Sequence, residues 1–300
     1  MNLRGLANRI FPATGIALMK RAEKRIQKAR RAFMPPLNEK DFLNILVNTL
    51  GLTEGDTVFV HSSIDQVNLA FPFGRVLVLL QSVVGEKGTL LFPTYPRVSS
   101  YEFLLHGAIF DVRKTPSFTG VLAEAARRQR NAVRSLHPTK SVCAIGRYAH
   151  ELTSDHQASP YPYDRCSPYY KIMALKGKIV GIGVSTEVLS FVHCVDDELK
   201  QDFPVHPYHE RLFEAKCVNY TGQIEVVRTY AHDRCKMNHN TLRYIRTYIQ
   251  PEICDDLEIS KRKFFRAHSE PLFAAMTKLA RAGITIYPRS VYSQHTSKAP

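Results

Sequence analysis

The sequence predicts an α/β protein: a three-layer α/β/α fold with a central mixed sheet, a basic helix before it, and a C-terminal hairpin/helix region. Short apolar runs of strand length recur at 58–60, 90–92, 142–146 and 178–183. Segments whose apolar residues recur at helical spacing alternate with these runs. After residue 207 the pattern changes to two longer segments that flank a turn.

Residues 1–34 carry most of the positive charge. The chain has 300 residues and a formal net charge of +14, and nine Lys or Arg with one Glu give this segment +8. A helical stripe of apolar residues runs through it: Met19, Ala22, Ile26, Ala29 and Phe33. Pro35 and Pro36 end the helix. We therefore divide the chain into a basic amphipathic helical extension, 1–34, and a larger domain, 35–300.

More than one partner suits the basic helix. It can lie on an anionic membrane surface. The alternative is that its apolar stripe packs on its own domain or on a second subunit of a homo-oligomer. A nucleic-acid partner is disfavoured, because the charge is confined to one helix and no nucleic-acid-binding motif accompanies it.

The composition also bounds the location. No apolar run reaches 18 residues, so no membrane span is expected. The apolar stretch 10–19 lacks a small-residue cleavage site and is followed by Lys20-Arg21, which argues against a signal peptide. We expect a cytoplasmic protein, either in solution or peripheral on the inner membrane face.

The elements of the body follow in order. Asn38 is a helix cap before 39–50, and Gly51 ends that helix. The next predicted elements are strand 58–60, helix 74–84, strand 90–92, helix 120–130 and the strands 142–146 and 178–183. A β-hairpin is predicted at 213–220 and 223–230, and helices at 240–248 and 269–282, with Ser269 as the cap of the last. The role of residues 208–300 stays open.

Polar residues follow two of the predicted strands. His61, Ser62 and Ser63 come at the end of the first, and Thr94 and Tyr95 come directly after the second. Ligands collect at the carboxyl ends of strands in open α/β sheets. The sequence therefore predicts one shared site at these two strand ends.

A series of motifs in a fixed order narrows the choice of protein family. The segments are VFVHSS (58–63), GEKGTLLFPTYP (85–96), TPSFTGVLAEAARR (115–128), RSLHPTKSVCAIG (134–146), GKIVGIGV (177–184) and SFVHCVDDE (190–198). Their order resembles that of the aminoglycoside 3-N-acetyltransferase family, from about Asp41 to about Pro207. The resemblance implies the same three-layer fold, acetyl-CoA as co-substrate, and acylation of an amino group. The larger domain is then an acetyltransferase domain.

The resemblance also points to a general base. In SFVHCVDDE, Ser190, His193 and Asp196 match the family's Thr-x-x-His-x-x-Glu element. On a helix, His193 and Asp196 lie on one face, so the carboxylate would orient the imidazole. We predict both as catalytic residues, with Asp197 and Glu198 as alternative partners. The plain alternative is a buried histidine with a structural hydrogen bond.

Other matching positions are candidate binding residues. The resemblance implies CoA contacts by His61, Ser62, Ser63, Arg134 and Ser135, and Ser117 and Thr119 precede a helix N-terminus, which suits an anion. Thr94, Tyr95 and His137 are predicted to bind the acceptor. Each of these side chains has a plain alternative in local hydrogen bonding. No metal site is predicted, because the spacing in HDRCKMNH (232–239) fits no common zinc site.

Charge guides the choice of acceptor. The body keeps a formal charge of about +6, which suits an acceptor less cationic than an aminoglycoside. We therefore expect an acetyl-CoA-dependent N-acetyltransferase that acts on a nucleotide-activated amino sugar in bacterial surface-polysaccharide biosynthesis, by direct transfer with His193 as base. One alternative is an aminoglycoside 3-N-acetyltransferase. Another is a non-catalytic, membrane-recruited binding protein, which the Asp at 196 would permit. The sugar, the amine position and the number of subunits stay open.

Overall fold

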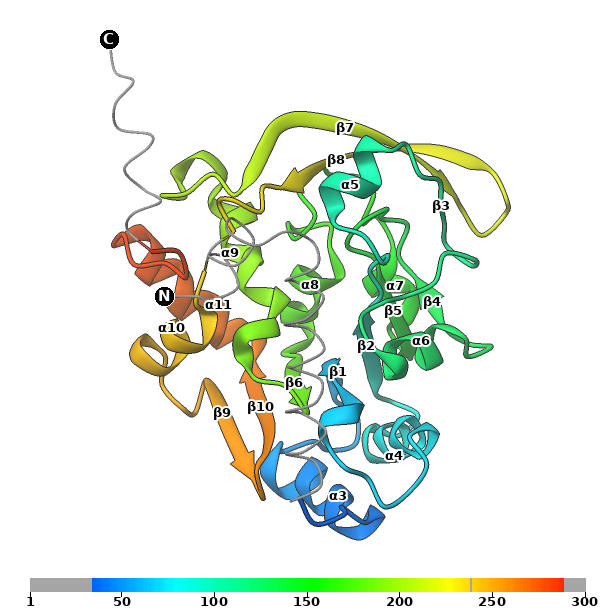
Figure 1. The fold of residues 1–300 in the computed structure, drawn as a ribbon, viewed down its shortest axis with the longest axis vertical. Coiled ribbons are helices and arrows are strands. Elements are labelled where there is room, and N and C mark those ends of the chain that lie inside the picture. Colours follow the sequence, from blue (N-terminus) through cyan, green and yellow to red (C-terminus); the bar gives the residue numbers. More distant parts are fainter. Residues whose placement is uncertain (1–33, 238, 289–300) are drawn as a thin grey trace, which may run out of the picture.

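A seven-stranded mixed sheet forms the middle of the molecule (Figure 1). The computed structural model describes residues 34–237 and 239–288, and all structural statements concern these. The strand order is β4-β5-β2-β1-β6-β10-β9, with the bounds Val133–Arg134, Val142–Gly146, Thr89–Pro93, Thr57–Ser62, Lys178–Ile182, Arg262–His268 and Cys254–Ile259. β1 runs parallel to β2 and to β6, and the other pairings are antiparallel.

Helices cover both faces of this sheet. The α-helices of the described residues are α3 Glu39–Asn44, α4 Gly74–Val84, α5 Ser100–Leu105, α6 Val121–Arg127, α7 Ala149–Thr153, α8 Pro168–Lys171, α9 His193–Leu199, α10 Thr241–Tyr248 and α11 Ser269–Arg281. A π-helix, η1 Ile45–Thr49, continues α3, and short 3₁₀ helices are η2 Ile64–Gln66, η3 Ile172–Leu175, η4 Thr186–Val188, η5 Ser190–Val192 and η6 Lys200–Asp202.

Alternate residues of the strands belong to two hydrophobic cores, one on each face of the sheet. Phe59 and Leu91 belong to the core packed by α7, α8, α9, α10 and α11. Val58, Val60 and Leu90 belong to the opposite core, packed by α3, α4 and α6. Successive strand residues point to opposite faces, so a buried strand needs apolar residues at every position. The predicted three-layer α/β/α fold with a mixed central sheet is confirmed.

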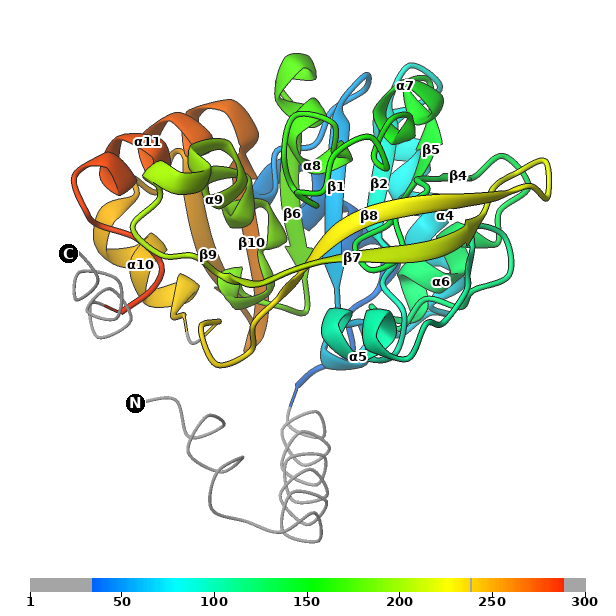
Figure 2. The same cartoon turned by 90° about the horizontal axis from the view of Figure 1, so that it is seen from above.

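A second sheet crosses the molecule. It has the order β3-β7-β8, with β3 at Phe110–Asp111, β7 at Tyr208–Val218 and β8 at Ile224–His232. Figure 2 shows β7 and β8 as a long twisted ribbon in front of the larger sheet. This ribbon and α5 enclose a smaller core around Phe103, Phe110 and Phe213. The predicted hairpin is thereby confirmed.

Two local predictions need correction. Strands β9 and β10 were not predicted, yet β10 pairs with β6 and extends the central sheet. Ser269 is the first residue of α11 rather than its cap, a position that His268 takes. The predicted helices at 39–50, 74–84 and 240–248 are present, the first partly as π-helix, and Asn38 accepts a hydrogen bond from the Asp41 amide as expected.

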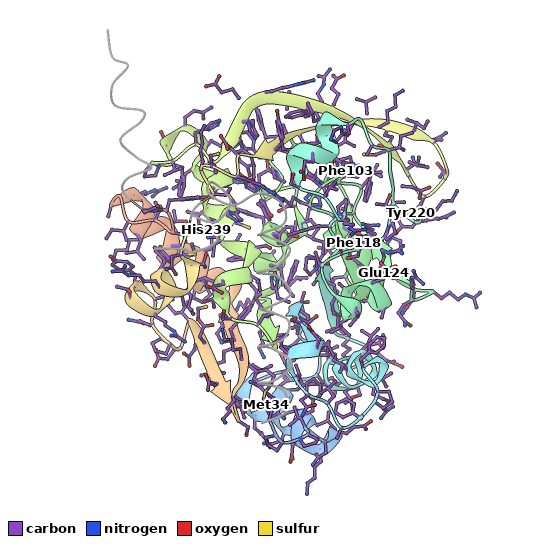
Figure 3. The ribbon with its side chains drawn as sticks, in the orientation of Figure 1. Met34, Phe103, Phe118, Glu124, Tyr220 and His239 are labelled. Atoms are coloured by element: carbon purple, nitrogen blue, oxygen red, sulfur yellow. The ribbon has the colours of Figure 1, made fainter. Side chains whose placement is uncertain are left out.

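The predicted N-terminal helix lies outside the described residues except for its last position. Met34, labelled in Figure 3, is buried, and its carbonyl accepts a hydrogen bond from Asn68 Nδ2. Arg262 donates to the carbonyls of Pro35 and Val67. Hydrogen bonds thus hold Met34 and Pro35 against the body. We therefore place the boundary between the extension and the body before Met34.

Candidate active site

The carboxyl ends of β1, β2 and β6 lie at one edge of the central sheet, since the three strands are parallel neighbours. A loop closes over two of these ends: Thr119 Oγ1 donates to the Pro93 carbonyl, and a Cβ on Gly120 would lie 3.0 Å from the Ser62 carbonyl oxygen. Gly120 also has φ +114°, which a side chain would strain. The two predicted strand ends are therefore adjacent, as expected.

His193 and Asp196 form a hydrogen-bonded pair at the start of α9. Their Nδ1 and Oδ2 atoms are 2.9 Å apart, and both side chains are buried. The Tyr287 hydroxyl donates to the same Oδ2 at 2.7 Å. A carboxylate can only accept, so Nδ1 carries the hydrogen and Nε2 keeps its lone pair. The imidazole is thereby oriented as a base.

The neighbouring acids have other partners. Asp197 accepts from the Tyr163 amide at 2.7 Å and from the Tyr208 hydroxyl at 2.6 Å. Burial raises the pKa of Asp197 well above its usual range. Glu198 forms a salt bridge with Arg165. Of the three candidate partners for His193, Asp196 is the one that the structure pairs with it.

Aromatic rings and two further imidazoles surround His193. Its ring centroid lies 5.2 Å from that of Tyr163, 5.0 Å from that of His232 and 5.5 Å from that of His239. Burial lowers the pKa of His239 to about 3, and it lowers that of His232 well below its usual range. These two imidazoles are therefore neutral near pH 7.

Tyr95 connects the end of β2 to this cluster. Its hydroxyl donates to Ser190 Oγ at 3.1 Å and lies 2.5 Å from the Tyr169 hydroxyl. Ser190 stands three residues before His193, in the short helix that leads into α9. The Tyr95 hydroxyl also lies 3.5 Å from that of Tyr163, whose ring neighbours His193. Tyr95 therefore places the end of β2 close to the surroundings of the His193–Asp196 pair.

An apolar groove adjoins the end of β1. It has a volume of about 250 Å³ and is lined by Ile64, Asp65, Leu69, Phe71, Phe73 and Val121. Ile64 follows Ser63 directly, and Val121 follows Gly120. Residues that adjoin Ser63 and Gly120 in the chain thus line the groove.

Comparison with known proteins identifies the family. The family described as aminoglycoside 3-N-acetyltransferase matches residues 59–280. The chain belongs to this family. The match continues past Pro207, so residues of β7 to β10 and most of α11 are part of the family's fold, although the sequence motifs there are weak.

Two relatives show moderate sequence identity to this chain. Aminoglycoside N(3)-acetyltransferase VII of Streptomyces paromomycinus is 30% identical over 193 residues, which is 59% of this chain and 62% of that protein. Aminoglycoside N(3)-acetyltransferase IX of Micromonospora chalcea is 28% identical over 159 residues, 48% of this chain and 56% of that protein. The chain thus spans about six-tenths of the length of these relatives.

Solved structures of aminoglycoside acetyltransferases share the fold. The crystal structure of AAC(3)-Xa aligns with a TM-score of 0.69 at 20% identity, over 88% of this chain and 99% of that one. AAC-IIIb in a binary complex with CoASH aligns with a TM-score of 0.68 at 19% identity, over 85% and 100%. Sisomicin-bound AAC-VIa gives 0.69 at 20%, over 84% and 100%.

In this acetyltransferase-family chain, Arg134 is buried. The guanidinium donates to Thr94 Oγ1, Ser141 Oγ and the carbonyls of Thr94 and Thr115. Burial lowers its pKa to about 10. Both side chains have internal hydrogen-bond partners, so their positions lend no support to the predicted phosphate contact by Arg134 or to the predicted acceptor contact by Thr94.

Ser135 and His137 are internal as well. Ser135 Oγ bonds His156 Nδ1 at 2.8 Å and accepts from the Val142 amide, and both serine and histidine are buried. His137 Nδ1 accepts from the Lys140 amide at 3.0 Å. These contacts hold the turn between β4 and β5, so the roles predicted for Ser135 and His137 are not supported by their positions.

A side-chain carboxylate already binds the backbone at Ser117, just before the helix N-terminus. Glu124, labelled in Figure 3, accepts from the Ser117 amide at 2.8 Å and pairs with Arg127 and Arg128. Ser117 Oγ and Thr119 Oγ1 bond each other at 2.8 Å. A side-chain carboxylate thus takes this position and α6 has only seven residues, so the structure lends no support to the anion site predicted there.

In the HSS element, His61-Ser62-Ser63, the histidine is buried and the two serines are more accessible. His61 is buried beside Phe59 and Phe265, and burial lowers its pKa to about 3. Ser62 and Ser63 remain half-buried, and Ser63 Oγ donates to Asp65. The two serines thus stay candidates for CoA contact, whereas the His61 ring faces the core.

Sequence reasoning missed several side chains of the site. Tyr163, Tyr169, His232 and Tyr287 come from distant segments, and no local spacing marks them. Lys140 carried a weak signal, as a lysine two residues after the His-Pro of a family motif. In the described ranges no group of three or more His, Cys, Asp or Glu side chains could hold a metal ion, and no helix there is long and apolar enough to cross a membrane.

Proposed function

We propose that this chain is an acetyl-CoA-dependent N-acetyltransferase that acylates an amine of an amino sugar. The observation that carries the proposal is the buried His193–Asp196 pair, whose carboxylate also accepts a hydrogen bond from the Tyr287 hydroxyl. The pair is intact although Asp replaces the family's Glu. This speaks against the alternative of a binding protein that has lost its chemistry.

The chemistry follows from the free lone pair. His193 Nε2 takes a proton from the acceptor's ammonium, and the resulting amine nitrogen attacks the thioester carbonyl carbon. The tetrahedral intermediate loses a second nitrogen proton and expels the CoA thiolate, which is protonated as the thiol. Acetyl moves from sulfur to nitrogen, and no acyl-enzyme forms. Asp196 stabilises the imidazolium that appears in the first step.

The end of β1 offers a candidate place for acetyl-CoA. Ser62 and Ser63 are half-buried at the end of β1, and the apolar groove that follows them suits the pantetheine arm. The apolar lining of the groove includes Leu69, Phe71, Phe73 and Val121. The reactive thioester would then lie near the Tyr95 hydroxyl. One solved structure of the same fold, that of AAC-IIIb, is a binary complex with CoASH.

The names of the relatives favour one acceptor class. They are aminoglycoside N(3)-acetyltransferases, and one structure of the same fold contains sisomicin. An aminoglycoside is therefore better supported than the nucleotide-activated amino sugar that charge alone suggested. The role in surface-polysaccharide biosynthesis has no support beyond that charge argument.

A thiol-release assay with acetyl-CoA tests the proposal. The panel contains sisomicin, simple amino sugars and nucleotide-linked amino sugars. We expect release with at least one amine and a fall in kcat of about 10²–10⁴-fold in His193→Ala, with CoA affinity by calorimetry changed less than about threefold. His150→Ala, an exposed histidine of α7, is the matched control. A His193→Ala variant with more than half the activity would remove this residue from the mechanism.

A further inference from the structure

A second buried imidazole lies beside the proposed base. The ring centroids of His232 and His193 are 5.0 Å apart, and the His232 ring is 5.7 Å from that of Tyr163. His232 is the last residue of β8, whereas His193 is the first residue of α9. The smaller sheet therefore contributes a ring to the surroundings of a base that a helix of the larger layer positions.

The fold holds the His232 ring in place. His232 pairs with Tyr208 across the ribbon, and the two rings are stacked, with centroids 4.5 Å apart and an interplanar angle of 12°. The Tyr208 hydroxyl donates to Asp197 of α9 at 2.6 Å. Directly after the strand pair, the Asp233 amide donates to the Pro207 carbonyl at 2.9 Å. These contacts fix the end of the ribbon, and His232 with it, against α9.

Although the ring is held, one of its nitrogens has no partner. His232 Nε2 is buried, and none of the described residues forms a hydrogen bond with it. The third imidazole of this cluster differs, because His239 Nδ1 bonds Thr241 Oγ1 at 3.0 Å. A buried polar atom without a partner destabilises a fold, and a role in binding or catalysis is one reason for keeping it.

We infer that His232 Nε2 forms a hydrogen bond with the acceptor, next to the amine that His193 deprotonates. The inference rests on the proposed acetyl transfer and adds a second imidazole to its acceptor site. The acceptor amine must reach the lone pair of His193. A hydroxyl or amine on a neighbouring carbon of the sugar then comes close to the rings that contact His193, and His232 is one of these.

The chemistry of His232 suits an aminoglycoside. Burial lowers the pKa of His232 well below its usual range, so the ring is neutral near pH 7 and does not repel a polycation. A neutral imidazole nitrogen accepts a hydrogen bond from an ammonium or hydroxyl, or donates one to a hydroxyl oxygen, according to the tautomer. An aminoglycoside carries both amines and hydroxyls, so either tautomer finds a partner on it.

Equilibrium binding of sisomicin gives a test that needs no turnover. The full-length protein, saturated with CoA, is titrated with sisomicin in a calorimeter. His232→Phe keeps a ring that can stack on Tyr208 and removes both nitrogens. We expect this variant to bind sisomicin about 5–50-fold more weakly and to bind CoA as the wild type does. His232→Gln, whose amide reaches the position of Nε2, should restore most of the affinity, whereas the shorter His232→Asn should not.

Two further measurements separate binding from folding. His232→Phe should raise the KM for sisomicin by a similar factor and change kcat by less than about threefold. Its melting temperature should equal or exceed that of the wild type, because the variant removes an unsatisfied buried atom. His209→Phe is the matched control. His209 follows Tyr208 in β7, its ring lies 4.2 Å from that of Tyr101, and its loss should leave sisomicin binding unchanged.

Several results would overturn the inference. It is wrong if the wild type does not bind sisomicin, if His232→Phe binds it as tightly as the wild type, or if His232→Phe melts lower and His232→Gln does not restore binding. Thiol release separates the two proposals. Acetylation that does not depend on His232 defeats only this inference. Binding that depends on His232, without acetylation of any amine, defeats the transferase and leaves the binding site.

Discussion

Asp196 receives two hydrogen bonds on one oxygen, from His193 Nδ1 and from the Tyr287 hydroxyl. The first fixes which imidazole nitrogen keeps a lone pair, and the second fixes the carboxylate. An amide at position 196 could present its NH₂ to Nδ1, which would move the ring hydrogen to Nε2. The orientation of the base thus depends on the charge of Asp196 and not only on its size.

Asp196→Asn is therefore expected to lower kcat by about 10²–10⁴-fold, because the imidazole takes the wrong tautomer. Tyr287→Phe should cost less, about three- to tenfold, since it removes one of the two bonds to the carboxylate. Steady-state kinetics with acetyl-CoA and the best amine provide the measurement, and CoA binding should be unchanged in both variants. A larger kcat loss in Asp197→Asn, at equal folded fraction, would contradict the assignment of Asp196.

Burial of His61 is expected to make the stability of the fold depend on pH in the acidic range. Its folded-state pKa of about 3 lies below the unfolded value of about 6.5, so the neutral form is favoured in the fold. Stability from this group is complete above about pH 6.5 and is lost as the pH falls from there toward 3. At pH 5 the loss is about 2 kcal/mol. His156 also has a pKa near 3 and adds a loss of the same sign.

His61→Leu should accordingly flatten the decline of unfolding free energy between pH 7 and pH 5 by about 2 kcal/mol. Urea unfolding at the two pH values, followed by fluorescence or circular dichroism, measures this. The exposed histidine variant His150→Ala serves as control, because an exposed imidazole has no burial to relieve. Equal declines in His61→Leu and wild type would show that the buried ring can take up a proton without cost.

Among the elements, the β9–β10 hairpin has an unusual turn. Its two loop residues, Ser260 and Lys261, have φ values of 48° and 65°, and Ile259 pairs with Arg262. Two positive φ angles in a two-residue loop are typical of a type I′ turn, which favours Asn-Gly. Non-glycine residues there cost stability, and this turn positions the strand that joins the central sheet.

Lys261→Gly should raise the free energy of unfolding by about 0.5–1 kcal/mol, because glycine adopts this conformation without steric cost. The melting temperature should rise by a few degrees. Lys263→Gly, two residues away inside β10, is the opposite control and should destabilise. A lower melting temperature for Lys261→Gly would mean that the lysine side chain contributes more than the backbone conformation costs.

The same hairpin shows where sequence reasoning stops. Strands β1, β2, β5 and β6 are nearly continuous apolar runs, so their existence and approximate bounds follow from the sequence. β9 and β10 mix acids and bases with apolar residues, and their turn lacks Asn-Gly, so no local signal marks them. His193 and Asp196 are three residues apart, and their pairing was predictable. Tyr287 is 91 residues from Asp196, and only the fold brings it there.

Arg134 illustrates a different limit. A sequence motif shows that an arginine is present, but it cannot show whether the guanidinium faces a ligand or the protein's own carbonyls. Here the hydrogen bonds to the carbonyls of Thr94 and Thr115 show that the Arg134 guanidinium faces the protein interior. Such a side chain supports the loops that shape a site without touching what binds in it.

In the molecule as a whole the charge is uneven, because residues 1–33 hold +8 of the formal +14. Deleting residues 1–33 should leave a folded body, because Met34 and Pro35 are held by Asn68 and Arg262. If the segment binds anionic membranes, vesicle co-sedimentation should fall sharply on deletion and weaken with salt in the full-length protein, at about 1 kcal/mol per basic residue. Turnover should hardly change.

The rival role for residues 1–33 gives a different result. If the segment packs on the body or on a second subunit, deletion lowers the melting temperature or changes the mass seen by light scattering. Vesicle binding by the full-length protein would then be negligible at low salt, and that observation would end the membrane proposal.

The place of β10 in the central sheet has a consequence for synthesis. β6 ends at Ile182, and its antiparallel neighbour begins only at Arg262, so about eighty residues separate two strands that lie side by side. Until the later strand leaves the ribosome, the nascent chain presents an unpaired, apolar sheet edge, which is prone to association. A chain stopped near residue 207 contains every strong family motif and the proposed base. It would still lack the strand that closes that edge, and it should precipitate or bind chaperones.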